Sequence, residues 1–251
     1  MNHEQQIQHA AALIRKAQNM VAMTGAGIST PSGIPDFRSP NSGLWDQISP
    51  LAVASIHAFR QRPQVFYDWV HPLTRTFVEA RPNPAHYALV ALERQNKLKA
   101  VITQNIDNLH RRAGSQIVYE LHGHFRETVC LQCHEVQDSG RVFEKFGHDG
   151  QVPRCHCGGV LKPNAVLFGE QLPVQALVLA QLAVKEADLM LIIGSSLEVA
   201  PASDLPALAL ERGATVIIIN QQATYLDSKV DLVIRGDVAD ILPRIVELVA
   251  V

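Results

Sequence analysis

Four cysteines fall into two pairs whose spacing suits a metal ion. The first pair encloses two residues, the second encloses one, and 21 residues lie between the pairs. Gly158 and Gly159 follow the second pair and allow the close turn that it needs. His134 and His156 adjoin the cysteines, but four sulfurs already complete a closed tetrahedral site. We therefore predict structural zinc bound by Cys130, Cys133, Cys155 and Cys157.

A glycine turn near the N-terminus could bind a phosphate. Residues 20–23 predict a short buried strand, and Gly25, Ala26 and Gly27 follow it. The two glycines let the backbone turn sharply and expose N–H groups to an anion. The full dinucleotide fingerprint has a third glycine three residues later, where this chain has Thr30. The turn favours nucleotide binding and weakens the interpretation as a hydride-transferring dehydrogenase.

The residues after the turn suit a loop that closes over a ligand. The Ser29 hydroxyl can bond at the start of a helix or turn. Residues 33–38 then place an acid, an aromatic ring and a cation beside glycine and proline. We expect Asp36, Phe37 and Arg38 to belong to this loop.

Polar or small residues follow each of the other main predicted strands. These strands are residues 99–103, 116–121, 188–193 and 215–219. Ligands bind at the carboxyl ends of parallel strands, so these residues predict a nucleotide crevice, although an Asn or Asp here could instead cap a helix. One of them, His122, could take a proton near neutral pH, because the unperturbed pKa of histidine is ~6.5. The residues at these ends are Gln104, Asn105, Ile106, Asp107, His122, Gly194, Ser195, Ser196 and Asn220.

Strands and helices alternate along most of the chain. Helical patterns cover residues 6–18, 84–95, 173–186, 203–212 and 238–249, and a last short strand covers 232–234. This alternation predicts an α/β fold with a parallel sheet covered on both faces. Prolines and aromatic residues recur between 40 and 81, which predicts short helices outside the sheet. Residues 166–168 could be a core strand or an edge strand that accepts a peptide.

Composition excludes several classes of protein. The 251 residues are 47% hydrophobic, enough for one large domain that carries a small one. The net charge is −2 without a basic cluster, so we do not expect nucleic-acid binding. No apolar run reaches the ~18 residues that span a bilayer, and the polar N-terminus lacks a signal-peptide core. We expect a cytoplasmic protein that does not bind membranes.

Taken together, these motifs resemble the sirtuins, which are NAD-dependent protein lysine deacylases. The resemblance runs in order from about residue 20 to about residue 240 and includes the segments 33–38, 121–123 and 166–170. It implies a Rossmann-type domain and a smaller domain made of a zinc module and a helical module. The implied boundaries are 1–39, 83–123 and 163–251 for the Rossmann-type domain, 40–82 for the helical module and 124–162 for the zinc module.

The resemblance also implies a reaction. The amide oxygen of an acyl-lysine attacks the ribose carbon that bears nicotinamide, and nicotinamide leaves. His122 then acts as general base on a ribose hydroxyl, which attacks the resulting imidate, while Asn105 helps to position the reacting groups. The partners would be proteins that contain acetylated lysine. NAD would be a co-substrate and zinc a structural ion.

The resemblance also implies which residues of this chain contact NAD and the acyl-lysine. NAD contacts are expected from Gly25, Ala26, Gly27, Ser29, Asp36, Phe37, Arg38, Gln104, Asn105, Ile106, Asp107, Gly194, Ser195, Ser196, Asn220, Gln221 and Val238. Acyl-lysine contacts are expected from Phe37, Val166, Phe168, Gly169, Glu170 and Val199.

One departure from the family concerns the acyl group. Sirtuins that remove succinyl or malonyl groups have Tyr-x-x-Arg in the helical module, and this chain has Tyr67 but Val70 in place of the arginine. The missing cation favours a neutral acyl group, with the Tyr67 hydroxyl still expected in the tunnel. Two alternatives use the same motifs: a protein mono-ADP-ribosyltransferase, and a non-catalytic module that binds zinc and a nucleotide.

Overall fold

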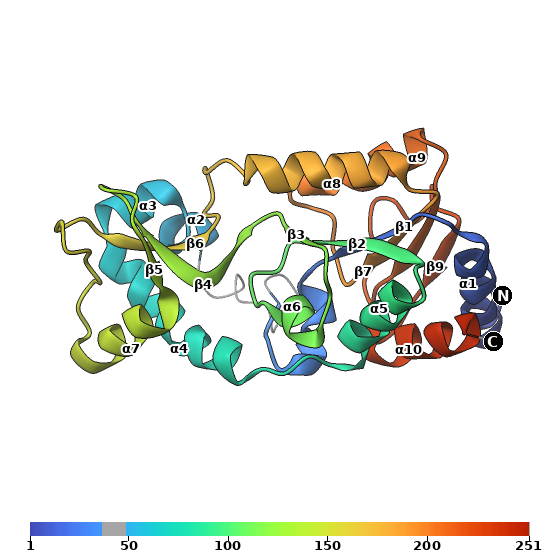
Figure 1. Cartoon of the computed structure of the whole chain (residues 1–251), viewed down its shortest axis with the longest axis horizontal. Coiled ribbons are helices and arrows are strands. Elements are labelled where there is room, and N and C mark those ends of the chain that lie inside the picture. The colour runs from blue at the N-terminus through green and yellow to red at the C-terminus, as the bar shows by residue number, and fades with distance from the viewer. Residues whose placement is uncertain (37–48, 251) are drawn as a thin grey trace.

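A six-stranded parallel sheet is the centre of the larger part of the molecule (Figure 1). The structure is a computed structural model that describes residues 1–36 and 49–250. The strand order is β3-β2-β1-β7-β8-β9, so the direction of winding reverses between β1 and β7. In such sheets the ligand crevice lies at this switch point, at the carboxyl ends of the strands. The strands are β1 (Met20–Thr24), β2 (Leu98–Thr103), β3 (Val118–Glu120), β7 (Leu189–Ile193), β8 (Thr215–Ile219) and β9 (Leu232–Ile234).

Helices cover both faces of this sheet, as Figure 1 shows. Along β7, Leu191 and Ile193 pack in one core while Ile192 packs in the other, as expected for side chains that alternate between the faces. Every residue of β1 and β7 is buried, which explains their continuous apolar runs. The first core lies under α1 (His3–Lys16), α5 (Pro84–Arg94) and α10 (Val238–Val249), and the second under α8 (Val174–Glu186) and α9 (Leu205–Glu211).

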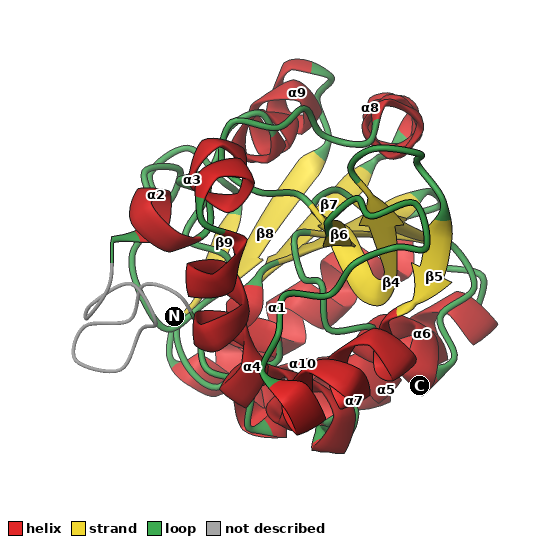
Figure 2. Ribbon diagram, turned by 90° about the vertical axis from the view of Figure 1, so that its left-hand side faces the viewer, coloured by secondary structure: helices red, strands yellow, loops and turns green. Residues whose placement is uncertain are grey.

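A second, antiparallel sheet has the strand order β5-β4-β6. Its strands are β4 (Gly123–Cys130), β5 (Val136–Asp138) and β6 (Leu161–Ala165). Figure 2 shows α2 and α3 on one side of this end of the molecule and β4 and β5 on the other. A third core of aromatic residues, among them Phe59, Phe66 and Phe143, joins these elements. The helices are α2 (Pro50–Val53), α3 (Ile56–Gln61), α4 (Pro63–Glu79) and α7 (Ser139–Asp149).

Most elements of the large sheet match the sequence prediction, and the differences have local causes. Between residues 50 and 79 we expected only short helices, but α4 runs for 17 residues with Pro72 inside it. A proline inside a helix removes one hydrogen bond, and the aromatic packing of α4 compensates for that loss. Residues 166–168 form no regular strand, although Phe168 makes a single bridge to Ser55. The division into five domain segments stays a prediction.

Four short helices complete the described chain. One, α6 (Leu109–Ala113), follows β2. The 3-10 helices are η1 (Ala26–Ile28), η2 (Thr30–Ser32) and η4 (Ala202–Asp204). Among the described residues no helix has both the length and the apolar character needed to cross a bilayer.

Candidate functional site

The glycine turn after β1 lies directly against the end of β7. The N–H of Gly25 donates to Ile193 O at 3.1 Å, and the N–H of Gly27 donates to Gly194 O at 2.9 Å. A Cβ added to Gly27 would come within 2.8 Å of the Gly194 Cα, so the two backbones touch. This contact explains why the turn needs glycine, and it places the turn at the switch point of the sheet.

Polar side chains join the ends of β1, β2 and β7. Gln104 Nε2 donates to Ser195 Oγ at 2.9 Å. Asn105 Nδ2 donates to Gly25 O and to Ser29 Oγ, both at 3.1 Å. The Ser29 hydroxyl in turn donates to Asp107 Oδ2 at 2.7 Å. These bonds fix the amide of Asn105 at the wall of the crevice.

Asp107 is a buried carboxyl group that holds the loop after β2. Its Oδ1 accepts from the Leu109 N–H at 2.8 Å, at the start of α6. Burial raises the pKa of Asp107 above its usual value, while the bonds from Leu109 and Ser29 act in the opposite direction. Neither Asp107 nor Ser29 lines the cavity described below, so their direct contact with NAD stays a prediction.

His122 lies between the two sheets, after β3 and directly before β4. Its Nδ1 is 3.0 Å from Gln104 O. A carbonyl oxygen only accepts hydrogen bonds, so Nδ1 carries a proton and Nε2 is the nitrogen that can receive one. The Val166 N–H donates to His122 O at 2.8 Å and holds the backbone from the opposite side. The imidazole is thus oriented for general base chemistry.

One cavity of about 320 Å³ connects these groups, a size typical of ligand pockets. Phe37 and Arg38, which we also expected at the site, lie outside the described residues. The predicted residues that line the cavity are Gly25, Ala26, Gly27, Asp36, Gln104, Asn105, Ile106, His122, Val166, Phe168, Gly169, Glu170, Gly194, Ser195, Ser196, Val199, Asn220, Gln221 and Val238.

The part of the cavity wall that the sequence analysis missed is mainly apolar. Phe66, Trp69, Leu73 and Phe77 come from one face of α4, together with Val70, which we had expected near the acyl group. Their spacing of three or four residues is the helical signal that could have identified this face. Further lining residues that were not predicted are Thr30, Ala54, Phe125, Ala165, Leu167, Leu172, Ala200 and Gln222.

Tyr67 does not line the cavity, contrary to our expectation. It is fully buried, and its hydroxyl donates to Leu161 O at 2.7 Å. The ring packs against Phe143 and Phe146 on the other side of α4. The expectation rested on the spacing between Tyr67 and Val70, but in the structure only Val70 of these two faces the cavity.

The segment after β6 bonds to the residues between α2 and α3 and is also held by Glu170. The Phe168 N–H donates to Ala54 O at 2.9 Å, and Phe168 O accepts from the Ile56 N–H at 3.0 Å. Glu170 lies 3.0 Å from Lys162 Nζ and accepts the Leu167 N–H at 2.8 Å. The carboxylate of Glu170 therefore closes the turn that carries Phe168.

The four cysteines converge on one point. The Sγ atoms of Cys130 and Cys157 lie 3.5 Å apart, and those of Cys133 and Cys155 lie 3.6 Å apart. Four sulfurs at Zn–S distances of about 2.3 Å would lie about 3.8 Å apart in a tetrahedron, so the cluster fits zinc. A Cβ on Gly159 would lie 2.5 Å from the Cys130 Sγ, which explains the glycine there. The four thiolates are Cys130, Cys133, Cys155 and Cys157.

Removing one thiolate should remove the metal and destabilise the fold. We expect Cys155→Ala to lose stoichiometric zinc and to unfold at a lower temperature. Three sulfurs leave the zinc site open, and the metal would no longer join the two cysteine pairs beside the small sheet. His156→Ala is the control: its imidazole is 2.9 Å from Glu135, and the variant should retain zinc. Metal analysis and a melting curve test both variants. A zinc-free Cys155→Ala protein with unchanged melting temperature would contradict a structural role.

The fold and site thus define an α/β nucleotide-binding protein with an attached metal module. Residues 25–201 match the model of the Sir2 family. An NAD-dependent protein deacetylase of Sulfurisphaera tokodaii is 47% identical over 229 residues, which are 91% of this chain and 90% of that protein. NAD-dependent protein deacylase 2 of Archaeoglobus fulgidus is 46% identical over 97% of this chain and 96% of its own length.

Solved structures give the same result. One described as "Structural Basis for the Mechanism and Regulation of Sir2 Enzymes" has a TM-score of 0.92 at 45% identity and covers 98% of both chains. Another, described as "Sir2-p53 peptide-NAD+", has a TM-score of 0.89 at 38% identity and covers 96% of this chain and 97% of the other. This chain belongs to the Sir2 family, the sirtuins.

Proposed function

We propose that this chain is an NAD-dependent protein lysine deacetylase. The observation that carries the proposal is the position of His122, which lines the cavity and contacts both Gln104 of the polar wall and Val166 of the apolar wall. The polar wall suits a nucleotide and the apolar wall suits the alkyl stem of an acylated lysine. Relatives with this name support it, as do solved relatives whose descriptions name a p53 peptide with NAD and a propionylated peptide.

NAD would lie along the strand ends as a co-substrate. The glycine turn would lie against the phosphates, since Gly25, Ala26 and Gly27 line the cavity and glycine lets a ligand approach the backbone closely. Asn105 would contact the nicotinamide half, and the residues after β7, β8 and β9 would hold the adenosine half. The last group comprises Gly194, Ser195, Ser196, Asn220, Gln221 and Val238, all of which line the cavity.

The acylated peptide would enter from the other side. Val166, Phe168, Gly169 and Glu170 would hold the substrate strand on one side and Val199 on the other. The acyl-lysine stem would then cross the apolar wall formed by α4. An amide oxygen is a weak nucleophile, so it must be held in line and away from water, which this wall provides.

In the reaction, the amide oxygen bonds to the ribose carbon as the carbon–nitrogen bond to nicotinamide breaks. Nε2 of His122 then takes the proton of a ribose hydroxyl, and that oxygen attacks the imidate carbon. With one water consumed, the products are free lysine, nicotinamide and O-acyl-ADP-ribose. Zinc at the cysteine cluster would be structural and not catalytic, since four thiolates leave no position for water. It would stabilise the small sheet.

Mass spectrometry of a reaction with NAD and an acetyl-lysine peptide tests this function. We expect free lysine peptide, nicotinamide and O-acetyl-ADP-ribose in equal amounts. NAD labelled in its adenine separates the alternative: label on protein would indicate an ADP-ribosyltransferase, and label on O-acetyl-ADP-ribose indicates the deacetylase. The absence of any turnover would contradict both.

The preferred acyl group should be neutral. Val70 is 1% exposed and lies in the apolar wall, and the Tyr67 hydroxyl is bonded to Leu161. A succinyl carboxylate would therefore be buried in this wall without a partner, which is costly. We expect a higher kcat/KM for acetyl than for succinyl peptides of the same sequence.

Val70→Arg should narrow or reverse this preference, because it adds a cation to the wall. Val65→Arg is a matched control on the same helix, since Val65 is exposed and does not line the cavity. Steady-state kinetics on the paired peptides measure both effects. Equal efficiency on succinyl-lysine in the unsubstituted protein would show that the pocket contains another cation.

A further inference from the structure

The chain segments that follow β2 and β3 run side by side, and His122 lies within the second. The Leu121 N–H donates to Thr103 O at 2.9 Å, and the Phe125 N–H donates to Ile106 O at 3.3 Å. The contact between His122 and Gln104 lies between these two bonds. The position of His122 therefore depends on how firmly the two segments are joined.

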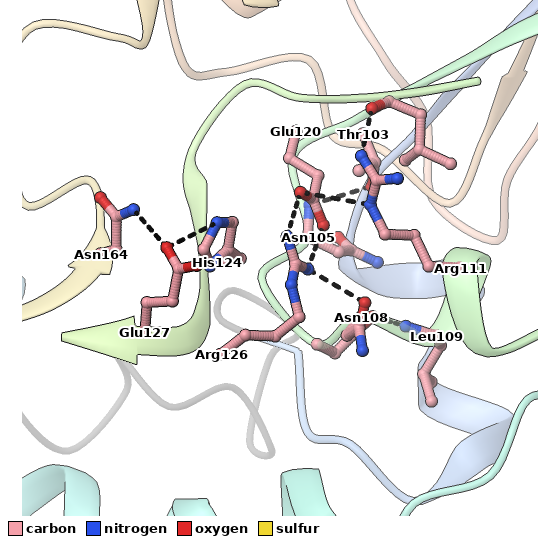
Figure 3. A network of polar contacts seen from close by, with 12 residues as sticks. Thr103, Asn105, Asn108, Leu109, Arg111, Glu120, His124, Arg126, Glu127 and Asn164 are labelled. Atoms are coloured by element: carbon pink, nitrogen blue, oxygen red, sulfur yellow. Dashed lines mark hydrogen bonds and ion pairs between the residues drawn. The ribbon is translucent and has the colours of Figure 1, made fainter. Parts of the chain in front are cut away.

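Arg126 makes a further contact between the segments that follow β2 and β3 (Figure 3). Its Nη1 donates to Asn108 Oδ1 at 3.0 Å, just after the loop that carries Asn105. The same guanidinium binds both oxygens of Glu120, with Nη1–Oε1 at 2.6 Å and Nη2–Oε2 at 2.7 Å. A bidentate arginine–carboxylate pair fixes geometry as well as charge. This pair ties residue 120 to residue 126, on either side of His122.

Glu120, Arg126 and Asn108 thus form a clamp. Its ion pair between Arg126 and Glu120 is partly shielded from water, so it is stronger than an ordinary surface ion pair. The Glu120 side chain is 10% exposed and that of Arg126 is 33% exposed. Arg111 also approaches Glu120, but through a single contact of 3.5 Å, and Figure 3 shows Glu120 between the two arginines. Loss of Arg126 would therefore leave the partly buried carboxylate paired with Arg111 through a single contact.

The backbone next to His122 cannot adjust toward β6. Gly123 has φ +70°, and a Cβ there would lie 2.1 Å from Asn164 O. The β6 side is closed by this contact and by the bond from Val166 to His122 O. The clamp of Glu120, Arg126 and Asn108 also ties the segment that carries the histidine to the segment after β2.

We propose that Arg126 is a positioning residue for acyl transfer, because its bonds to Glu120 and Asn108 hold the segment that carries His122. The proposal rests on the proposed function, in which His122 acts only after nicotinamide has left. The step that releases nicotinamide is reversible in principle and does not use His122. A misplaced His122 should therefore slow product formation and spare the earlier step.

The test compares two rates in Arg126→Met. One is the formation of O-acetyl-ADP-ribose, and the other is the exchange of labelled nicotinamide into NAD in the presence of acetyl peptide. We expect kcat for product formation to fall about 10- to 100-fold, since a displacement of ~1 Å can cost about 100-fold. Nicotinamide exchange and the KM for NAD should change less than about twofold.

Three further variants complete the experiment. Arg126→Lys keeps the charge without the bidentate geometry and should recover part of the product rate. Glu120→Gln should also lower product formation more than exchange, and the effect of the double variant should be smaller than the sum of the single effects, because both substitutions break the Arg126–Glu120 pair. Arg75→Met is the matched control, since Arg75 forms an exposed pair with Glu79 on α4 and should change neither rate.

Each outcome either supports or overturns the positioning role of Arg126. Product formation and exchange that fall in proportion would show a merely structural role and overturn the proposal, as would unchanged rates. If Arg126→Met fails to fold, Arg126→Lys and Glu120→Gln give the same comparison. Failure of the unsubstituted chain to form O-acetyl-ADP-ribose would instead overturn the proposed function.

Discussion

His122→Ala should lower the rate of deacetylation by about 10²–10⁴-fold, which is the usual effect of removing a general base. The imidazole lines the cavity, and its Nδ1 contact with Gln104 O leaves Nε2 to take the ribose proton. Binding of NAD should be retained, because the glycine turn and the ends of β7 and β8 do not depend on this side chain. Single-turnover kinetics and an NAD titration measure the two effects.

His9→Ala is a suitable control for this substitution. His9 is exposed on α1, on the far side of the large sheet from the small sheet, and should leave the rate unchanged. Nicotinamide exchange should also survive in His122→Ala, because the histidine acts in the later step. Near-normal product formation by His122→Ala would show that another group takes the proton.

Gly194→Ala should have the largest effect on stability and should abolish NAD binding. A Cβ at this position would lie 2.4 Å from the N atom of Ile28 and 2.5 Å from the carbonyl carbon of Gly27. Both contacts are with backbone, so neither can move aside as a flexible side chain would. The turn after β1 would have to separate from β7, and the phosphate site would open.

Gly213→Ala separates this clash from simple backbone strain. Gly213 also has positive φ, +78° against +59° for Gly194, but nothing lies within 4 Å of its added Cβ. The left-handed conformation should cost each variant roughly 1–2 kcal/mol. The clash should cost Gly194→Ala a further ~1–3 kcal/mol or more. Urea unfolding measures the difference, and equal losses in the two variants would contradict the close contact.

The sequence by itself determined the parallel sheet and the chemistry at its edge. Buried parallel strands are continuous runs of Val, Ile and Leu, and residues 215–219 and 232–234 show this locally, so these strands and α10 were predicted with their observed bounds. The cysteine spacing and the polar residues after the strands are also local patterns. They indicated His122 and Asn105, which line one cavity in the structure, and the four cysteines, which form one cluster.

Only the tertiary structure decided which side chains face the cavity. Helix α4 is apolar or aromatic on more than one side, so its sequence does not say whether Phe66 or Tyr67 lines the cavity. That choice depends on the packing of Tyr67 against α7, about 75 residues later in the chain. Likewise, Ser29 and Asp107 were predicted as NAD contacts, but in the structure they bond to each other outside the cavity lining, which depends on how β1 and β2 pair.

The clamp around His122 is a further product of tertiary structure. Glu120, Arg126 and Asn108 are ordinary polar residues in the sequence, with a spacing that fits no helix or strand pattern. They meet because β3 pairs with β2 in the large sheet, and the chain then passes directly into β4, which pairs with β6 in the small sheet. Local patterns specify which residues could do chemistry. The contacts that orient those residues come from segments that meet only when the two sheets are in place.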